Sequence, residues 1–221
     1  LAMRDNRIHL NGRPTALKGV CYVYDSPVHG LVMTDEQIAA DVALIKAAGC
    51  NAVRCHYPMD ERFYAACDRA GILVWVEPMV YCYHPHKDQH GTLFSDPVAT
   101  RLACQVIREM IATARNHVSV SLYGIGNECN TEHPESAAFF ATLAKTAREQ
   151  DPTRLLSYAA LYGNVGPLAD LVDVLGINSY FGWYGKIEGR TVPEGGTATP
   201  HPEGREPIDL TGMRQMLDGL L

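Results

Sequence analysis

The strongest constraint on the fold is a regular alternation of short apolar segments with segments of helical periodicity. About six strands and about six helices follow from this pattern. The strands are expected at residues 16–22, 51–54, 72–76, the first half of 119–130, 154–159 and 172–178. The helices are expected at residues 34–49, 61–70, 96–116, 134–150, 167–170 and 209–220. Repeated strand–helix units predict a parallel sheet with helices outside it.

Two architectures contain such units, a doubly wound sheet and a (β/α)8 barrel. A doubly wound sheet usually carries a glycine-rich phosphate-binding turn after its first strand, and Lys18-Gly19-Val20-Cys21 has no such pattern. Instead, polar or aromatic side chains follow nearly every expected strand, which is typical of a barrel. We therefore predict an α/β fold, an incomplete (β/α)8 TIM barrel with about six of its eight units in this chain. The side chains expected at one rim are Asp25, Arg54, Glu77, Glu128 and Tyr180.

Composition excludes several functional classes. The net charge of the 221 residues is −6 and there is no basic run, which argues against a nucleic-acid partner. No apolar stretch reaches the roughly 18 residues that a membrane span needs. The seven cysteines form no CxxC pair, which favours a reducing compartment or simple core packing. We therefore expect a cytoplasmic protein, with a periplasmic or secreted location as the alternative if a signal peptide precedes Leu1.

The stretch 119–130 ends in the residues with the clearest chemistry. Its first half is apolar and β-rich and predicts a buried strand, which ends at Gly126-Asn127-Glu128. At the end of a barrel strand, a carboxylic acid can protonate a leaving-group oxygen while the adjacent amide hydrogen-bonds a ring hydroxyl. The pair indicates a sugar-cleaving site, although Asn-Glu is also a common dipeptide in polar loops.

A long loop at 77–94 is rich in tyrosine and histidine. Its histidines, His84, His86 and His90, have a spacing that matches no standard metal site. We interpret the loop as the lining of a cleft and predict no metal.

A set of segments along the whole chain is similar to a known enzyme family. They are His29 to Gln37, Asn51 to Pro58, Phe63-Tyr64, Cys67-Asp68-Arg69, Gly71-Ile72, Arg115-Asn116-His117, Gly126-Asn127-Glu128 and Ile177 to Tyr184. Together they resemble the catalytic barrel of glycoside hydrolase family 2, which includes β-galactosidases, β-glucuronidases and β-mannosidases. The resemblance implies that residues 17–221 are a partial TIM-barrel glycosidase domain. Residues 1–16, with a turn signal at Asn11-Gly12, would be a junction hairpin at the end of a preceding immunoglobulin-like domain.

The resemblance also implies a reaction and a set of site residues. The reaction is retaining hydrolysis of terminal β-linked sugars by double displacement, which requires no cofactor. Glu128 would be the acid/base, and Asn127 would bind the sugar 2-hydroxyl. The other implied contacts are Arg54 and Tyr180 to the nucleophilic carboxylate, His56 and Asp25 to sugar hydroxyls, and Trp183 to a sugar ring or to its own loop.

Four of the supporting side chains also have a structural interpretation. Arg54 would then be an ion-pair partner and Tyr180 a core tyrosine. Asp25 would cap a turn, and Trp183 would anchor its loop.

The chain departs from the family pattern at several positions. Cys21 and Val23 replace the Asn and His that end the family's first strand, and Val118 replaces a proline. Arg54 and His56 are one residue closer together than in the family's Arg-x-x-His-Tyr-Pro motif. Met79 stands where some members have a magnesium-binding histidine, so this site is not predicted.

A retaining glycosidase needs a second carboxylate about 5–5.5 Å from the acid/base. In the family this nucleophile is a glutamate at the end of the seventh strand. Four glutamates, Glu188, Glu194, Glu203 and Glu206, lie in a Gly/Pro-rich loop, and none follows an apolar strand. We therefore expect the nucleophile beyond residue 221, and we expect the fragment alone to be inactive.

Two other functions fit the sequence. One is another retaining barrel glycosidase with the same Asn-Glu strand end, and the other is a non-catalytic sugar-binding barrel. The identity of the sugar is left open, because the segment Tyr180 to Tyr184 resembles glucuronidases whereas the segment His29 to Gln37 resembles galactosidases. We expect a carbohydrate substrate and a homo-oligomeric full-length protein.

Overall fold

The computed structural model describes residues 1–81 and 93–180, and the chain forms two compact units, Leu1–Ile177 and Asn178–Leu221. None of the described helices is long and apolar enough to cross a membrane. The helix expected at 209–220, the loop expected at 181–207 and most of the loop at 77–94 lie outside the described residues.

A small antiparallel sheet opens the chain. It contains β1 (Ala2–Arg4), β2 (Arg7–Leu10) and β3 (Arg13–Pro14), in that order. The predicted turn at Asn11-Gly12 connects β2 to β3, and both of its residues have positive φ, 51° and 80°. The strand expected at 16–22 begins only at Gly19 and belongs to the second sheet. Whether residues 1–16 end a preceding domain stays a prediction.

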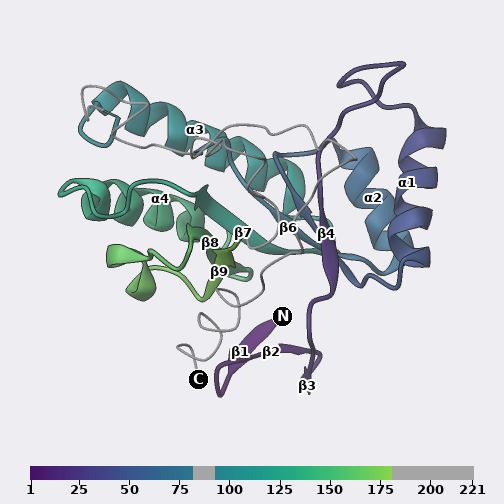
Figure 1. Ribbon diagram of the computed structural model, residues 1–221, viewed down its shortest axis with the longest axis horizontal. Helices are drawn as coiled ribbons and strands as arrows, with labels where there is room; N and C mark the ends of the chain where they lie inside the picture. The colour runs from purple at the N-terminus through teal and green to yellow at the C-terminus, as the bar shows by residue number, and fades with distance from the viewer. Residues whose placement is uncertain (82–92, 181–221) are drawn as a thin grey trace, which may run out of the picture. The chain divides into compact units, whose positions relative to one another are not determined.

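Six parallel strands form the main sheet in the order in which they occur along the chain. They are β4 (Gly19–Tyr22), β5 (Ala52–Cys55), β6 (Leu73–Val76), β7 (Val120–Asn127), β8 (Leu155–Leu161) and β9 (Val174–Asn178). A doubly wound sheet reverses its strand order at a switch point, whereas here each strand lies beside its neighbours in the sequence. The result is an open half-barrel, which confirms the predicted incomplete TIM barrel (Figure 1).

Helices connect these strands along the outer side of the sheet (Figure 1). They are α1 (Asp35–Ala47), α2 (Glu61–Ala70), α3 (Pro97–Ala114), α4 (Ser136–Gln150) and the 3-10 helix η1 (Gly166–Asp170). Their ends follow the signals in the sequence. Thr34 caps α1 through a reciprocal pair of hydrogen bonds with Gln37, and Gly71 ends α2 with φ at +65°.

The two faces of the sheet are buried to different extents. On β5 and β6, the side chains of Val53, Val74 and Val76 belong to the buried core, whereas Leu73 and Trp75 on the opposite face are half-buried. The continuous apolar run at 72–76 predicts a strand that is buried on both faces, and this prediction is wrong for the inner face of β6, which is only half-buried. The inside of a complete barrel is packed with side chains from all of its strands, and these six strands leave it partly open.

Candidate active site

One guanidinium group links the carboxyl ends of three adjacent strands. Arg54 is the third residue of β5, and Glu77 directly follows β6. The Arg54 Nε donates to Glu77 Oε1 at 2.7 Å, and Nη2 donates to Oε2 at 2.9 Å. Nη2 also donates to Oδ1 of Asn127, the last residue of β7, at 2.6 Å. Bidentate arginine–carboxylate pairs have a fixed geometry. The Arg54–Glu77 pair therefore orients the Asn127 amide.

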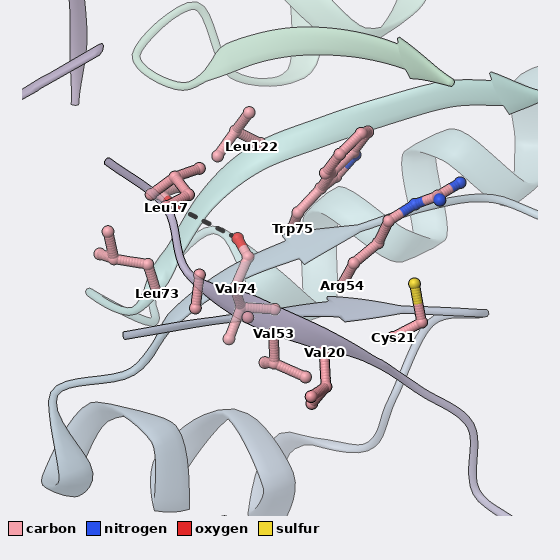
Figure 2. Close-up of a pocket in the computed structure, with 12 residues that line it drawn as sticks. Leu17, Val20, Cys21, Val53, Arg54, Leu73, Val74, Trp75 and Leu122 are labelled. Carbon is pink, nitrogen blue, oxygen red and sulfur yellow. Dashed lines mark hydrogen bonds between the residues drawn. The ribbon is translucent and has the colours of Figure 1, made fainter. Parts of the chain in front are cut away.

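Burial distinguishes this cluster of Arg54, Glu77 and Asn127 from a surface ion pair. The side chain of Glu77 is fully buried and that of Arg54 is 13% exposed. The Arg54 guanidinium also lies over the Trp75 ring, 4.7 Å from its centroid (Figure 2). Burial raises the pKa of Glu77 and the charge of Glu128 adds to this effect, while the hydrogen bonds from Arg54 oppose it. Arg54 therefore provides the main compensation for a carboxylate that burial disfavours.

Glu128 has an unusual backbone conformation. Its φ of 51° lies in the left-handed region, which costs a residue with a Cβ roughly 1–2 kcal/mol. Hydrogen bonds on both sides hold this geometry: Glu128 N donates to Ala159 O, and Cys129 N donates to Tyr158 Oη, both at 2.8 Å. Strained residues held by their surroundings are concentrated at functional sites, which agrees with a chemical role for Glu128.

His56 contacts the same buried carboxylate. Its Nε2 is 3.2 Å from Glu77 Oε2, although the contact does not have hydrogen-bond geometry. Burial and the positive charge of Arg54 lower the pKa of His56 to about 4, against a smaller opposing effect of Glu128. The ring is therefore neutral at neutral pH, and its contact with Glu77 is not an ion pair under those conditions.

This lowered pKa predicts a dependence of stability on pH. The pKa of His56 is about 4 in the folded protein, whereas an unperturbed histidine, as in the unfolded chain, has a pKa of 6.5. The unfolded chain therefore takes up the proton first as the pH falls. His56 therefore makes the native state progressively less stable between about pH 6.5 and pH 4. In the full-length protein, His56→Gln should show a smaller drop in melting temperature over this range than the wild type. Equal drops in calorimetric scans at pH 7, 5.5 and 4 would contradict the assignment.

The structure brings together four of the seven residues predicted for the site. Arg54 contacts Asn127, the next residue is Glu128, and the charges of Arg54 and Glu128 both influence His56. Asp25 lies exposed in the loop after β4. Tyr180 follows β9 in the second compact unit, and Trp183 lies outside the described residues. Their roles stay predictions.

Two residues of the cluster received no role from the sequence. Glu77 was placed at the rim because it follows an apolar segment, but its contact with Arg54 depends on the pairing of β5 with β6. Gly124, inside β7, provides the space for Glu77, because a Cβ there would lie 2.5 Å from Glu77 Cγ. A glycine within a strand is a recognised sign of such a close approach.

A separate pocket of about 220 Å³ lies inside the half-barrel (Figure 2). Its lining is mostly apolar and includes Val20, Leu73, Trp75 and Leu122. Arg54 borders both this pocket and the polar cluster, but Asn127 and Glu128 do not line it. We therefore assign the pocket to the unfilled barrel interior and the chemistry to the strand ends. Within residues 1–81 and 93–180, no three potential metal ligands are grouped, and the predicted loop histidines lie outside these ranges.

Comparison with known proteins gives consistent matches. The chain matches the model of the glycosyl hydrolases family 2, TIM barrel domain, over residues 1–205. It is 30% identical to the β-glucuronidase of Mus musculus over 190 residues, which are 83% of this chain and 28% of the relative. It is 32% identical to the β-galactosidase of Lactococcus lactis subsp. lactis over 134 residues, which are 58% of this chain and 13% of the relative.

A solved structure extends the likeness to the fold. The Bacteroides uniformis β-glucuronidase 2, covalently bound to cyclophellitol-6-carboxylate aziridine, matches with a TM-score of 0.75 at 27% identity. The match covers 97% of this chain and 24% of that one. The chain thus spans less than a third of the length of each of these three relatives.

Proposed function

This chain belongs to glycosyl hydrolase family 2, within its TIM barrel domain, and we propose that the protein containing it is a retaining β-glycosidase. Its substrate is a carbohydrate with a terminal β-linked galactose or glucuronate. The observation that best supports this function is the buried Asn127-Glu128 pair at the end of β7, with its amide oriented by Arg54. An oriented amide beside a carboxylic acid is suited to holding a sugar hydroxyl while a glycosidic oxygen is protonated.

In the first step, a carboxylate attacks the anomeric carbon and the bond to the leaving oxygen breaks. Glu128 gives its proton to that oxygen, so the aglycone leaves as a neutral alcohol and the sugar becomes an ester of the enzyme. In the second step, Glu128 removes a proton from water as the water attacks the anomeric carbon. The ester bond breaks, and the sugar leaves with its original anomeric configuration.

Glu77 is the described carboxylate that must be distinguished from the nucleophile. Both of its oxygens accept hydrogen bonds from Arg54, and its side chain is fully buried. A carboxylate held in this way cannot reach an anomeric carbon. We therefore propose that the nucleophile comes from a seventh barrel strand, in addition to the six strands of the half-barrel.

The remaining predicted contacts complete the proposed site. Asn127 binds the 2-hydroxyl, a contact that strengthens in the transition state of such reactions. His56 and Asp25 bind other hydroxyls of the sugar. Tyr180 polarises the nucleophile together with Arg54, and Trp183 provides an aromatic face.

The test is to assay the full-length protein on 4-nitrophenyl β-galactoside and β-glucuronide, with the α-anomers as controls. We expect hydrolysis of a β-glycoside, with the β-anomer of the free sugar appearing first in proton NMR spectra. The α-anomer appearing first would indicate an inverting enzyme. Sugar binding without hydrolysis would identify a binding barrel instead.

A further inference from the structure

We propose that Glu77 is a positioning residue for the acid/base pair: it fixes the Arg54 guanidinium, which in turn fixes the Asn127 amide beside Glu128. This inference rests on the proposed glycosidase function and assigns a further residue to the same site. Glu77 itself does not touch the sugar, because its side chain is fully buried and both of its oxygens accept hydrogen bonds from Arg54.

The contacts form a directed chain. Two Arg54 nitrogens donate to the two Glu77 oxygens at 2.7 and 2.9 Å, which fixes both the position and the plane of the guanidinium. The same Nη2 that donates to Glu77 also donates to Asn127 Oδ1 at 2.6 Å. An amide flip would place the Asn127 NH2 group against a cation. The Glu77–Arg54 pair therefore determines which side of the amide faces the site.

The buried Glu77–Arg54 pair is energetically unfavourable in two respects, which indicates that it does more than fill space. A buried ion pair is often no more stabilising than well-packed apolar side chains of similar volume. Here β7 also has a glycine, Gly124, where any Cβ would lie 2.5 Å from Glu77 Cγ, and glycine weakens a strand interior. The chain thus carries two locally unfavourable features, and both serve to place one carboxylate behind Arg54.

The experiment uses three variants of the full-length enzyme. Glu77→Gln keeps the size of the side chain but removes its charge, and Glu77→Asp keeps the charge but shortens the reach. The matched control is Asp68→Asn, another carboxylate-to-amide change at a partly buried side chain that accepts hydrogen bonds. Asp68 contacts His117 Nδ1 at 2.7 Å and Ser119 N at 2.8 Å, at the opposite end of β7.

We expect Glu77→Gln to lower kcat/KM about 100-fold, because small misplacements of positioned groups have effects of this order. Most of the loss should be in kcat. Asp68→Asn should lower the melting temperature but leave kcat/KM within about threefold of the wild type, as expected for a change outside the site.

A double-mutant cycle separates positioning from a structural role. If Glu77 acts through Asn127, the double variant Glu77→Gln/Asn127→Ala should be hardly slower than Asn127→Ala alone, whereas independent effects would multiply.

The outcomes separate this inference from the proposed function. Two results, each with a wild type that hydrolyses the substrate, would overturn the positioning role alone. One is that the losses in kcat/KM from Glu77→Gln and Asn127→Ala multiply in the double variant. The other is that both Glu77 variants keep the wild-type kcat. If Glu77→Gln does not fold, Glu77→Asp replaces it in the double-mutant cycle with Asn127→Ala. A loss of kcat that does not add to the loss from Asn127→Ala supports the positioning role. A wild-type kcat, or a loss that does add, refutes it. A folded but inactive wild type would overturn both proposals.

Discussion

Replacing Glu128 by glutamine should nearly abolish hydrolysis of alkyl β-glycosides in the full-length enzyme. Glutamine keeps the shape of the buried side chain but cannot deliver a proton. A positioned general acid contributes about 10²- to 10⁴-fold, and we expect the upper end of this range for poor leaving groups. Dinitrophenyl glycosides need little protonation, so their first step should be slowed much less. The measurement is kcat/KM across a series of aglycones of decreasing pKa.

The second chemical step provides an internal check on Glu128. Glu128→Gln also lacks the base that activates water, so the sugar ester should accumulate with activated substrates. Azide needs no base, and its addition should restore turnover and give a β-glycosyl azide. The matched control is Glu132→Gln, because Glu132 is exposed and lies only four residues further along the chain. Equal losses on all aglycones, or a comparable loss in Glu132→Gln, would contradict the role of Glu128.

The fold was predictable because its signals are local. Thr34 is a capping candidate at the start of the expected helix and does cap α1, and Gly71, which directly follows the expected helix 61–70, ends α2. Polar residues after apolar strands located Arg54 and Asn127 at the same edge of the sheet, since parallel strands place their carboxyl ends together. Each of these predictions depends on a few consecutive residues and on the regular geometry of helices and strands.

The features that could not be predicted depend on long-range packing. The exposure of Leu73 and Trp75 depends on what fills the barrel interior, which the sequence of β6 does not contain. The role of Glu77 depends on the pairing of β5, β6 and β7, and on the space above Gly124. The positive φ of Glu128 has no local signal, because glutamate does not favour this conformation. The neutral state of His56 likewise arises from burial and from the proximity of Arg54.

Several expectations from the sequence stay predictions. They are the compartment, the homo-oligomeric state, the inactivity of residues 1–221 on their own and the choice between galactoside and glucuronide. None of them follows from the packing of the half-barrel. The substrate panel addresses the last, and mass measurement of the full-length protein in solution addresses the oligomer.

Removing the Arg54 charge should have the largest effect on stability. Arg54→Leu leaves the fully buried Glu77 carboxylate without its cation, and breaking one side of a buried ion pair typically costs about 3–5 kcal/mol. For a domain of this size, that loss corresponds to a decrease in melting temperature of about 10 °C. The difference in melting temperature between Arg54→Leu and the wild type should become smaller as the pH falls, because a protonated Glu77 needs no counter-charge. Calorimetry of the full-length protein at pH 5 and pH 8 measures both effects.

The double variant Arg54→Leu/Glu77→Leu separates the two contributions of the pair. With both charges removed, no buried carboxylate is left unpaired, and apolar replacement of a buried ion pair is often neutral or stabilising. We therefore expect most of the lost melting temperature to return, and the dependence on pH to disappear. Activity should not return, because the Arg54 hydrogen bond that orients the Asn127 amide is lost. A double variant as unstable as Arg54→Leu would mean that packing of the arginine against Trp75 matters more than its charge, and recovery of activity would show that the site does not need the oriented amide.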